Sequence, residues 1–293
     1  MQRLLKLLRD TGTDWYQDDA PRLAASLAYY TLLSTAPLVL LSVSVAGLAF
    51  GEEAARGQIA GQLGKVVGTQ AASVLEAIAK NAHEAPSGLF SSIISIVLLL
   101  LGASGVFGEL QTALNAMWGV KPKPGRGVRG FVRDRFLSFT MVLGVAFMLL
   151  VSLLISAALS AAGHFFADAL PGGATLWQAV NFVFSLAVIT GLFALIFKVV
   201  PDAAVRWRDV WVGAGVTAFL FTIGKLLLGI YLGSSSVASS YGAAGSLVAY
   251  VVWVYYASQI LFWGAEFTQA YARMEGKPIE PAPNAVAIPV HQH

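Results

Sequence analysis

The sequence predicts an all-α protein, a bundle of six helices that cross a membrane. Of its 293 residues, 57% are hydrophobic and only 12% are charged, which is about half the charged fraction of a soluble domain. The apolar residues are concentrated in six long runs, each with enough residues to cross the roughly 30 Å hydrocarbon core of a bilayer as a helix. Apolar and polar residues do not alternate within these runs, which argues against the strands of a membrane β-barrel.

The six predicted spans make residues 1–275 a single membrane domain. The spans are predicted at residues 26–50, 89–110, 136–162, 176–200, 210–232 and 247–270. Ahead of the first span, residues 1–10 place three basic side chains among four leucines. This pattern predicts a short amphipathic helix that lies at the level of the lipid headgroups.

Two further segments carry a structural prediction. Residues 51–88 connect the first two spans, and their apolar residues recur at helical spacing, which predicts amphipathic helices on the outer side of the bundle. A loosely helical loop is the alternative, because this segment is rich in glycine. Residues 276–293 contain four prolines, and we expect them to form a disordered cytoplasmic tail.

Lysine and arginine are unequally divided between the two sides that six spans create. Fifteen of the 19 lie at the two termini, between spans two and three, or beside the turn between spans four and five. Three lie on the opposite side, in residues 51–88, and Lys225 lies inside a span. Because basic residues are retained on the cytoplasmic side, both termini are predicted to be cytoplasmic.

Several short runs stand in a fixed order between about residues 14 and 273. They are AASLAYYTLLS at 24–34, LGAS at 101–104, LQTALNAMW at 110–118, VPD at 200–202, WVGA at 211–214, YGAAGS at 241–246, WVYY at 253–256 and GAE at 264–266. With these runs the chain resembles the YihY/BrkB family of bacterial inner-membrane proteins, once labelled ribonuclease BN. The resemblance implies a multi-pass protein of the bacterial inner (plasma) membrane, with a link to virulence in some members. It implies no biochemical activity and therefore no catalytic residues.

Lys225 is the lysine that lies well inside a predicted span. At 1.5 Å per residue it lies roughly 6 Å beyond the midpoint of the fifth span, and we find no carboxylate at the same depth. A charge at this depth is costly unless it faces a cavity or a partner. Either the long side chain extends to the outer headgroups, or it faces a cavity and contacts the negative group of a solute or lipid. Because ionisable residues inside a membrane usually face a cavity or a partner, we favour the interpretation that Lys225 faces a cavity.

Residues near the middle of the first span are candidates for the same cavity. Pro37 cannot donate a hydrogen bond to the carbonyl group of Leu33, so the helix is expected to kink and leave that carbonyl free. Ser34 and Thr35 add hydroxyl groups beside it. A purely structural kink is the alternative interpretation.

Two other segments complete the candidate cavity. The second span is interrupted by small residues at 102–105, and Gln111 and Asn115 follow at helical spacing on one face. Interrupted helices at membrane depth line cavities or are buried in protein, and helix packing explains the small residues equally well. Tyr241 lies in an uncharged, serine-rich segment that is either an outer re-entrant segment or a plain loop.

Charged residues are expected near the inner face as well. Glu109 and Glu266 are carboxylates near the cytoplasmic ends of spans two and six, and they either relay protons or pair with basic residues such as Arg133 and Arg135. The basic loop between spans two and three is expected to set the topology and to contact anionic headgroups. Its basic residues are Lys121, Lys123, Arg126, Arg129, Arg133 and Arg135.

The sequence argues against several kinds of chemistry. Cysteine is absent, and two of the four histidines, His291 and His293, lie in the tail, so we expect no metal site. No phosphate-binding loop of the Gly-x-x-x-x-Gly-Lys type is present, and we expect no cofactor. The basic loop carries no catalytic constellation and is better explained as the loop that sets the topology, so we expect neither a nucleic-acid partner nor ribonuclease activity.

Two functional hypotheses follow. The first is a transporter or lipid-handling protein for an anionic or amphipathic solute, with membrane lipids and that solute as its partners. The second is a non-transporting scaffold for envelope integrity or virulence, in which the same residues serve packing and anchoring. An enzyme is not expected. A polar, water-accessible cavity at Lys225 would separate the first hypothesis from the second.

Overall fold

The computed structural model describes residues 2–50, 105–124, 173–234 and 245–288. Its five long helices are α1 (Gln2–Gln17), α2 (Ala20–Phe50), α7 (Gly173–Val199), α8 (Trp207–Ser234) and α10 (Gly245–Met274). Residues 105–117 are also helical. Four short strands are β1 (Val120–Pro122), β2 (Ala203–Ala204), β3 (Glu280–Pro281) and β4 (Ala285–Ala287).

Three of the described helices contain segments that are long and apolar enough to cross a membrane. These segments are Phe182–Val199, Trp207–Leu228 and Leu247–Met274, and they coincide with the predicted spans four, five and six. The helix α2 covers the predicted first span. The helical membrane class is thus confirmed, while the number of six spans stays a prediction. The predicted span 136–162, most of span 89–110 and the outer segment 51–88 lie outside the described residues.

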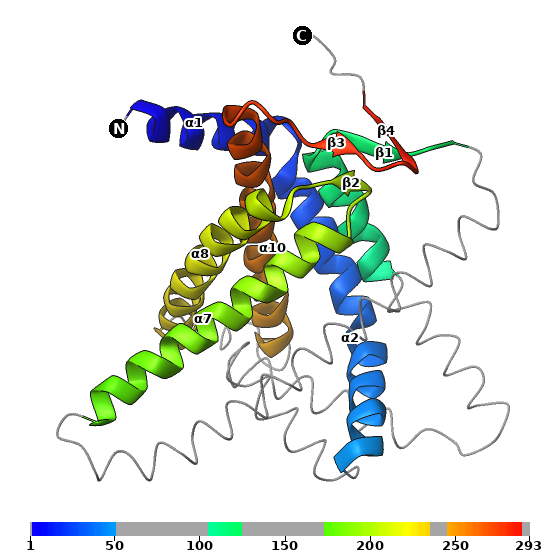
Figure 1. Ribbon diagram of the computed structural model, residues 1–293. Coiled ribbons are helices and arrows are strands. Elements are labelled where there is room, and N and C mark those ends of the chain that lie inside the picture. The colour runs from blue at the N-terminus through cyan, green and yellow to red at the C-terminus, as the bar shows by residue number, and fades with distance from the viewer. Residues whose placement is uncertain (1, 51–104, 125–172, 235–244, 289–293) are drawn as a thin grey trace, which may run out of the picture.

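The helices pack around α10, which lies between α2 and α8 (Figure 1). The helix α7 packs on α8, and α1 lies across the end of α10. Leu7 of α1 is buried against Phe267 and Ala270 of α10, whereas Leu4, Leu5 and Leu8 are exposed. An amphipathic helix with one face on the bundle and one apolar edge free suits the headgroup level, and it extends to Gln17, beyond the predicted residues 1–10.

The contact between α8 and α10 is built from reciprocal glycine and threonine pairs. A Cβ atom added at Gly213 would overlap the hydroxyl oxygen of Thr268 and lie 2.9 Å from its Cβ, and one added at Gly264 would meet Thr217 in the same way. Each threonine hydroxyl donates to the carbonyl of the glycine four residues before it, at 2.7 Å. Small residues at this spacing let two membrane helices approach closely.

The C-terminal segment is ordered as far as the structure describes it. The strand β4 pairs antiparallel with β1, and β3 pairs antiparallel with β2 (Figure 1). The prediction that residues 276–293 are disordered is therefore wrong for residues 276–288. Its prolines stand where they disturb little, because the strands are two or three residues long and a proline is tolerated in an edge strand.

The described core lies at the end of the bundle that carries α1 and the strands. Residues from α2, 105–117, α7, α8 and α10 meet there, among them Leu114, Phe197 and Phe262. Trp118 belongs to this core, with 2% of its surface exposed, and its indole nitrogen donates to the carbonyl of Ala265 at 3.1 Å. This hydrogen bond allows the indole ring to be fully buried.

Candidate functional site

An aspartate at the turn after α7 binds polar side chains from two other parts of the chain. The amide nitrogens of Gln111 and Asn115 donate to Oδ2 of Asp202 at 3.1 and 3.0 Å, and the amide of Asn284 donates to Oδ1 at 2.8 Å. The backbone N–H of Asp202 donates in turn to Oδ1 of Asn115 at 2.8 Å. We call Gln111, Asn115, Asp202 and Asn284 the Asp202 cluster.

The Asp202 cluster holds the helix 105–117, the α7–α8 turn and the C-terminal segment together. Gln111 and Asn115 share one helical face, as their spacing predicts, but their amides are engaged by Asp202. The backbone N–H of Ala282 also donates to the carbonyl of Asp202 at 2.9 Å. Asp202 is 6% exposed, and hydrogen bonds to a buried charge are strong. The cluster therefore positions the chain, and Gln111 and Asn115 are not brought to Lys225 by any contact of the described residues.

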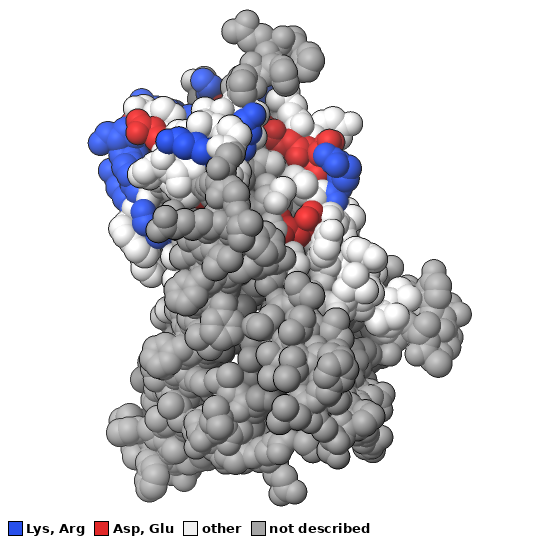
Figure 2. Space-filling view, turned by 90° about the vertical axis from the view of Figure 1, so that its right-hand side faces the viewer, with Lys and Arg blue, Asp and Glu red and all other residues white. Residues whose placement is uncertain are grey.

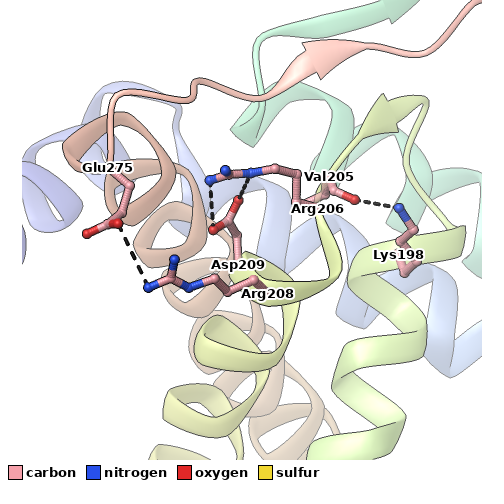
Figure 3. A network of polar contacts seen from close by, with 6 residues as sticks. All are labelled: Lys198, Val205, Arg206, Arg208, Asp209 and Glu275. Atoms are coloured by element: carbon pink, nitrogen blue, oxygen red, sulfur yellow. Dashed lines mark hydrogen bonds and ion pairs between the residues drawn. The ribbon is translucent and has the colours of Figure 1, made fainter.

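A second polar network lies between α7 and the start of α8 (Figure 3). Lys198 donates to the carbonyl of Val205 and lies over the ring of Trp207, 5.5 Å from its centroid. Arg206 holds both oxygens of Asp209, at 2.8 and 3.1 Å. Asp209 is 1% exposed and stands in the first turn of α8, where a carboxylate is favoured by the helix dipole.

The charged side chains in view gather at the same end of the molecule (Figure 2). Arg208 approaches Glu275 at the end of α10, with 4.0 Å between Nη2 and Oε2. Lys121 is exposed in the middle of β1, and Lys123 donates to the carbonyl of Pro283 at 2.8 Å. The other residues of the predicted basic loop, Arg126, Arg129, Arg133 and Arg135, lie outside the described residues.

The predicted hydroxyl pair in the first span is buried. Ser34 and Thr35 are 2% and 3% exposed. The hydroxyl of Thr35 lies 2.8 Å from the hydroxyl of Tyr250, which joins α2 to α10. A Cβ atom at Gly105 would lie 3.8 Å from the hydroxyl oxygen of Ser34, so the second span passes beside this pair. The helix α2 continues through Pro37 without interruption, and the candidate Tyr241 lies outside the described residues.

Lys225 lies on the face of α8 that packs against other helices. Ala214, Ala218, Phe221 and Lys225 stand four, three and four residues apart, which places them in one stripe along a helix. Ala214 and Ala218 are fully buried, and Phe221 contacts Phe193 of α7 and Trp253 of α10. We call these four residues of α8 the inner stripe.

The side chain of Lys225 has no partner among the described residues. It is half-buried and makes no hydrogen bond or ion pair with any of them, whereas Leu226 and Leu227 are 62% and 57% exposed on the other side of the helix. Lys225 thus extends the inner stripe one turn beyond Phe221, rather than joining the lipid-facing leucines.

The sequence profile described as Virulence factor BrkB matches residues 12–289 of this chain. The chain belongs to the BrkB family. The match covers all the described helices except the start of α1, and it includes Asp202, Gly213 and Gly264, which fall in the short runs that carry the resemblance. This family description names no enzymatic reaction.

Curated relatives of this BrkB-family chain are named membrane proteins. A UPF0761 membrane protein of Rhodospirillum centenum is 27% identical over 89% of this chain and 56% of its own length. A UPF0761 membrane protein of Pseudomonas paraeruginosa is 28% identical over 85% of this chain and 58% of its own length, and one of Tolumonas auensis is 29% identical over 86% and 81%. The chain thus spans little more than half of the first two relatives. No solved structure matches the chain.

Glu109 and Glu266, the two carboxylates that the sequence analysis named, lie in different environments in this BrkB-family chain. Glu109 is half-buried on the helix 105–117. Glu266 is fully buried in α10, and neither of its carboxyl oxygens has a hydrogen-bond partner among the described residues. The charged groups that interact with it are Asp14, Asp18 and Arg273, so within the described part the basic loop does not supply its partner.

Sequence reasoning missed two groups of residues that the structure brings together. Asp202 stood in a quoted run, but its partner Asn284 belongs to the segment expected to be disordered. Asp18 lies between α1 and α2, 248 positions before Glu266, and no spacing rule links two such distant residues. Gly264 and Glu266 both lie in the quoted run GAE at 264–266, and this run was the sequence signal that could have pointed to them.

Proposed function

We propose that this protein is a transporter or lipid-handling protein of the bacterial inner membrane that acts on an anionic or amphipathic solute. The observation that supports this function best is the position of Lys225 on the inner stripe of α8. Trp211 is an exposed tryptophan near the start of α8, as expected of a residue at the headgroup level. Lys225 follows 14 residues later, about 21 Å along the helix axis. A half-buried ammonium group at that depth is stabilised by water or by an anion.

The orientation that we propose places α1, the four strands and the C-terminal segment on the cytoplasmic side. The supporting observation is that the described basic residues of both termini and of the α7–α8 turn lie at one end of the bundle (Figure 2). Retention of Lys and Arg on the cytoplasmic side is the physical basis of this assignment. In this orientation Lys225 lies in the outer half of the membrane, where an anionic or zwitterionic group entering from outside would meet it.

A charge-removing substitution tests the proposed function. Lys225→Met keeps the length of the side chain and removes its charge. We expect the variant to fold and insert with a melting temperature within a few degrees of the unmodified protein, and to fail in a complementation assay of whatever phenotype the protein supports. The control is Leu226→Met, which changes the neighbouring exposed residue and should complement fully.

The scaffold hypothesis makes the opposite prediction for the same variant. A lysine that only extends to the headgroups has no specific role, so Lys225→Met would be neutral or stabilising, because it removes a charge from the membrane. Full complementation by Lys225→Met would therefore overturn the proposed function and leave the scaffold.

A further inference from the structure

Glu266 is a buried carboxyl group whose cationic neighbour is already engaged. The guanidinium of Arg273 donates to Asp14, and neither oxygen of Glu266 has a hydrogen-bond partner among the described residues. Removing an ionised carboxylate from water without a partner is far more costly than burying a neutral carboxyl group. An ionised Glu266 would therefore need a bound cation that neutralises its negative charge.

The second carboxyl group, Asp18, faces Glu266 from the junction of α1 and α2. The two side chains interact electrostatically, although their geometry in this structure is not that of a hydrogen bond. The other charged groups that act on Asp18 are Asp14, Asp19 and Arg273. Among the described residues, no three carboxylate or imidazole groups converge to hold a metal ion. A proton is the cation that suits two facing carboxyl groups of this kind.

We propose that Asp18 and Glu266 form a proton-binding site through which the junction of α1 and α2 is docked on α10. The proton is taken from water at the cytoplasmic end and is shared by the two carboxyl groups, which titrate as a pair. When the pair loses its proton, two negative charges face one another at a buried position, and the contact between α1 and α10 weakens. The inference is independent of Lys225 and of the transported solute.

The environment of Asp18 sets the sign of the expected pH dependence. Burial, the largest cause, raises the pKa of Asp18 above its ordinary value of 3.8, and the charge of Asp14 raises it further, while the contact with Glu266 and the charge of Arg273 act against this. Because the folded state then binds a proton more tightly than the unfolded chain, stability is greatest at acidic pH. It falls as the pH rises from the ordinary pKa through the raised one.

The experiment measures the melting temperature of the detergent-purified protein between about pH 5 and pH 8. We expect the unmodified protein to melt at a lower temperature at the upper end of this range. Glu266→Gln and Asp18→Asn, which keep shape and remove the charge, should each flatten the dependence and melt above the unmodified protein at about pH 8. The matched control is Glu109→Gln on the helix 105–117, which should keep the original slope.

A spectroscopic measurement shows the proton itself. The infrared spectrum of the unmodified protein should contain a band of a protonated carboxyl group that shifts in deuterium oxide and is lost in Glu266→Gln. The site is disproved if Glu266→Gln keeps both the slope and the band. If Glu266→Gln does not fold, Asp18→Asn at its half-buried position decides alone, and an unchanged slope in that variant contradicts the proposal.

Discussion

Replacing Gly213 with alanine is expected to destabilise the protein by about 3 kcal/mol or more, because one added methyl group has no space between α8 and α10. Its Cβ would overlap the hydroxyl of Thr268 and lie 2.9 Å from the Cβ of that residue and 3.3 Å from its Cγ2. These atoms belong to a short, β-branched side chain that cannot move aside. The two helices must separate, or the Thr268 hydroxyl must leave its hydrogen bond with Gly264.

The matched control for this prediction is Gly215→Ala on the same helix. No atom lies within 4 Å of a Cβ added at Gly215, so alanine should be neutral or slightly stabilising there, since it favours a helix by up to about 1 kcal/mol over glycine. The melting temperatures of the two variants in detergent are compared. The double variant Gly213→Ala with Thr268→Ala should recover part of the loss, because the overlapping hydroxyl is gone. Equal melting of the two single variants would contradict the interlocked contact.

Replacing Asp202 with alanine is expected to cost about 3 kcal/mol or more, because one buried side chain that accepts several hydrogen bonds is removed. The substitution leaves the amide donors of Gln111, Asn115 and Asn284 without their acceptor, and unsatisfied buried groups cost about 1–3 kcal/mol each. Asp202→Asn keeps the shape and should lose less, because one of its two terminal atoms still accepts.

The Asp202 prediction has a structural readout besides melting. Residues 276–288 are held through Asn284 and through the pairing of β3 with β2 and of β4 with β1, so Asp202→Ala should make this segment sensitive to limited proteolysis in its folded state. Asp19→Asn is the control, since Asp19 is exposed and its positive φ of 54° is tolerated by asparagine. If the C-terminal segment of Asp202→Ala were as protected as that of the control, the cluster would not hold it.

The long helices could be predicted because hydrophobic runs encode them directly. The predicted spans 176–200, 210–232 and 247–270 differ from α7, α8 and α10 by a few residues at each end. The helices are longer than the apolar runs, because polar residues such as Arg208 and Arg273 continue a helix past the hydrocarbon core. Apolar residues indicate which part of a helix lies in the hydrocarbon core, whereas the helix itself ends where its backbone hydrogen bonds end.

The contacts between distant segments could not be predicted in the same way. The common face of Gln111 and Asn115 follows from their spacing, but the acceptor Asp202 is fixed by how the α7–α8 turn folds back on the second span. The short strands β3 and β4 carry no alternating pattern of their own, and they form because β1 and β2 offer free edges beside them. The carboxyl pair of Asp18 and Glu266 depends in the same way on α1 crossing the end of α10.

The most direct test of the proposed function is the accessibility of position 225 to water. The chain contains no cysteine, so Lys225→Cys and Leu227→Cys are single-cysteine proteins without further changes. Both are reconstituted in membranes that are open to the reagent on both sides, and a charged, membrane-impermeant methanethiosulfonate is added. A thiol at position 225 should react rapidly if the proposed water-filled cavity reaches the inner stripe of α8, while a thiol at the lipid-facing position 227 should not. Failure of position 225 to react, or equal reaction at both positions, would contradict the cavity and with it the role of Lys225 in binding a solute.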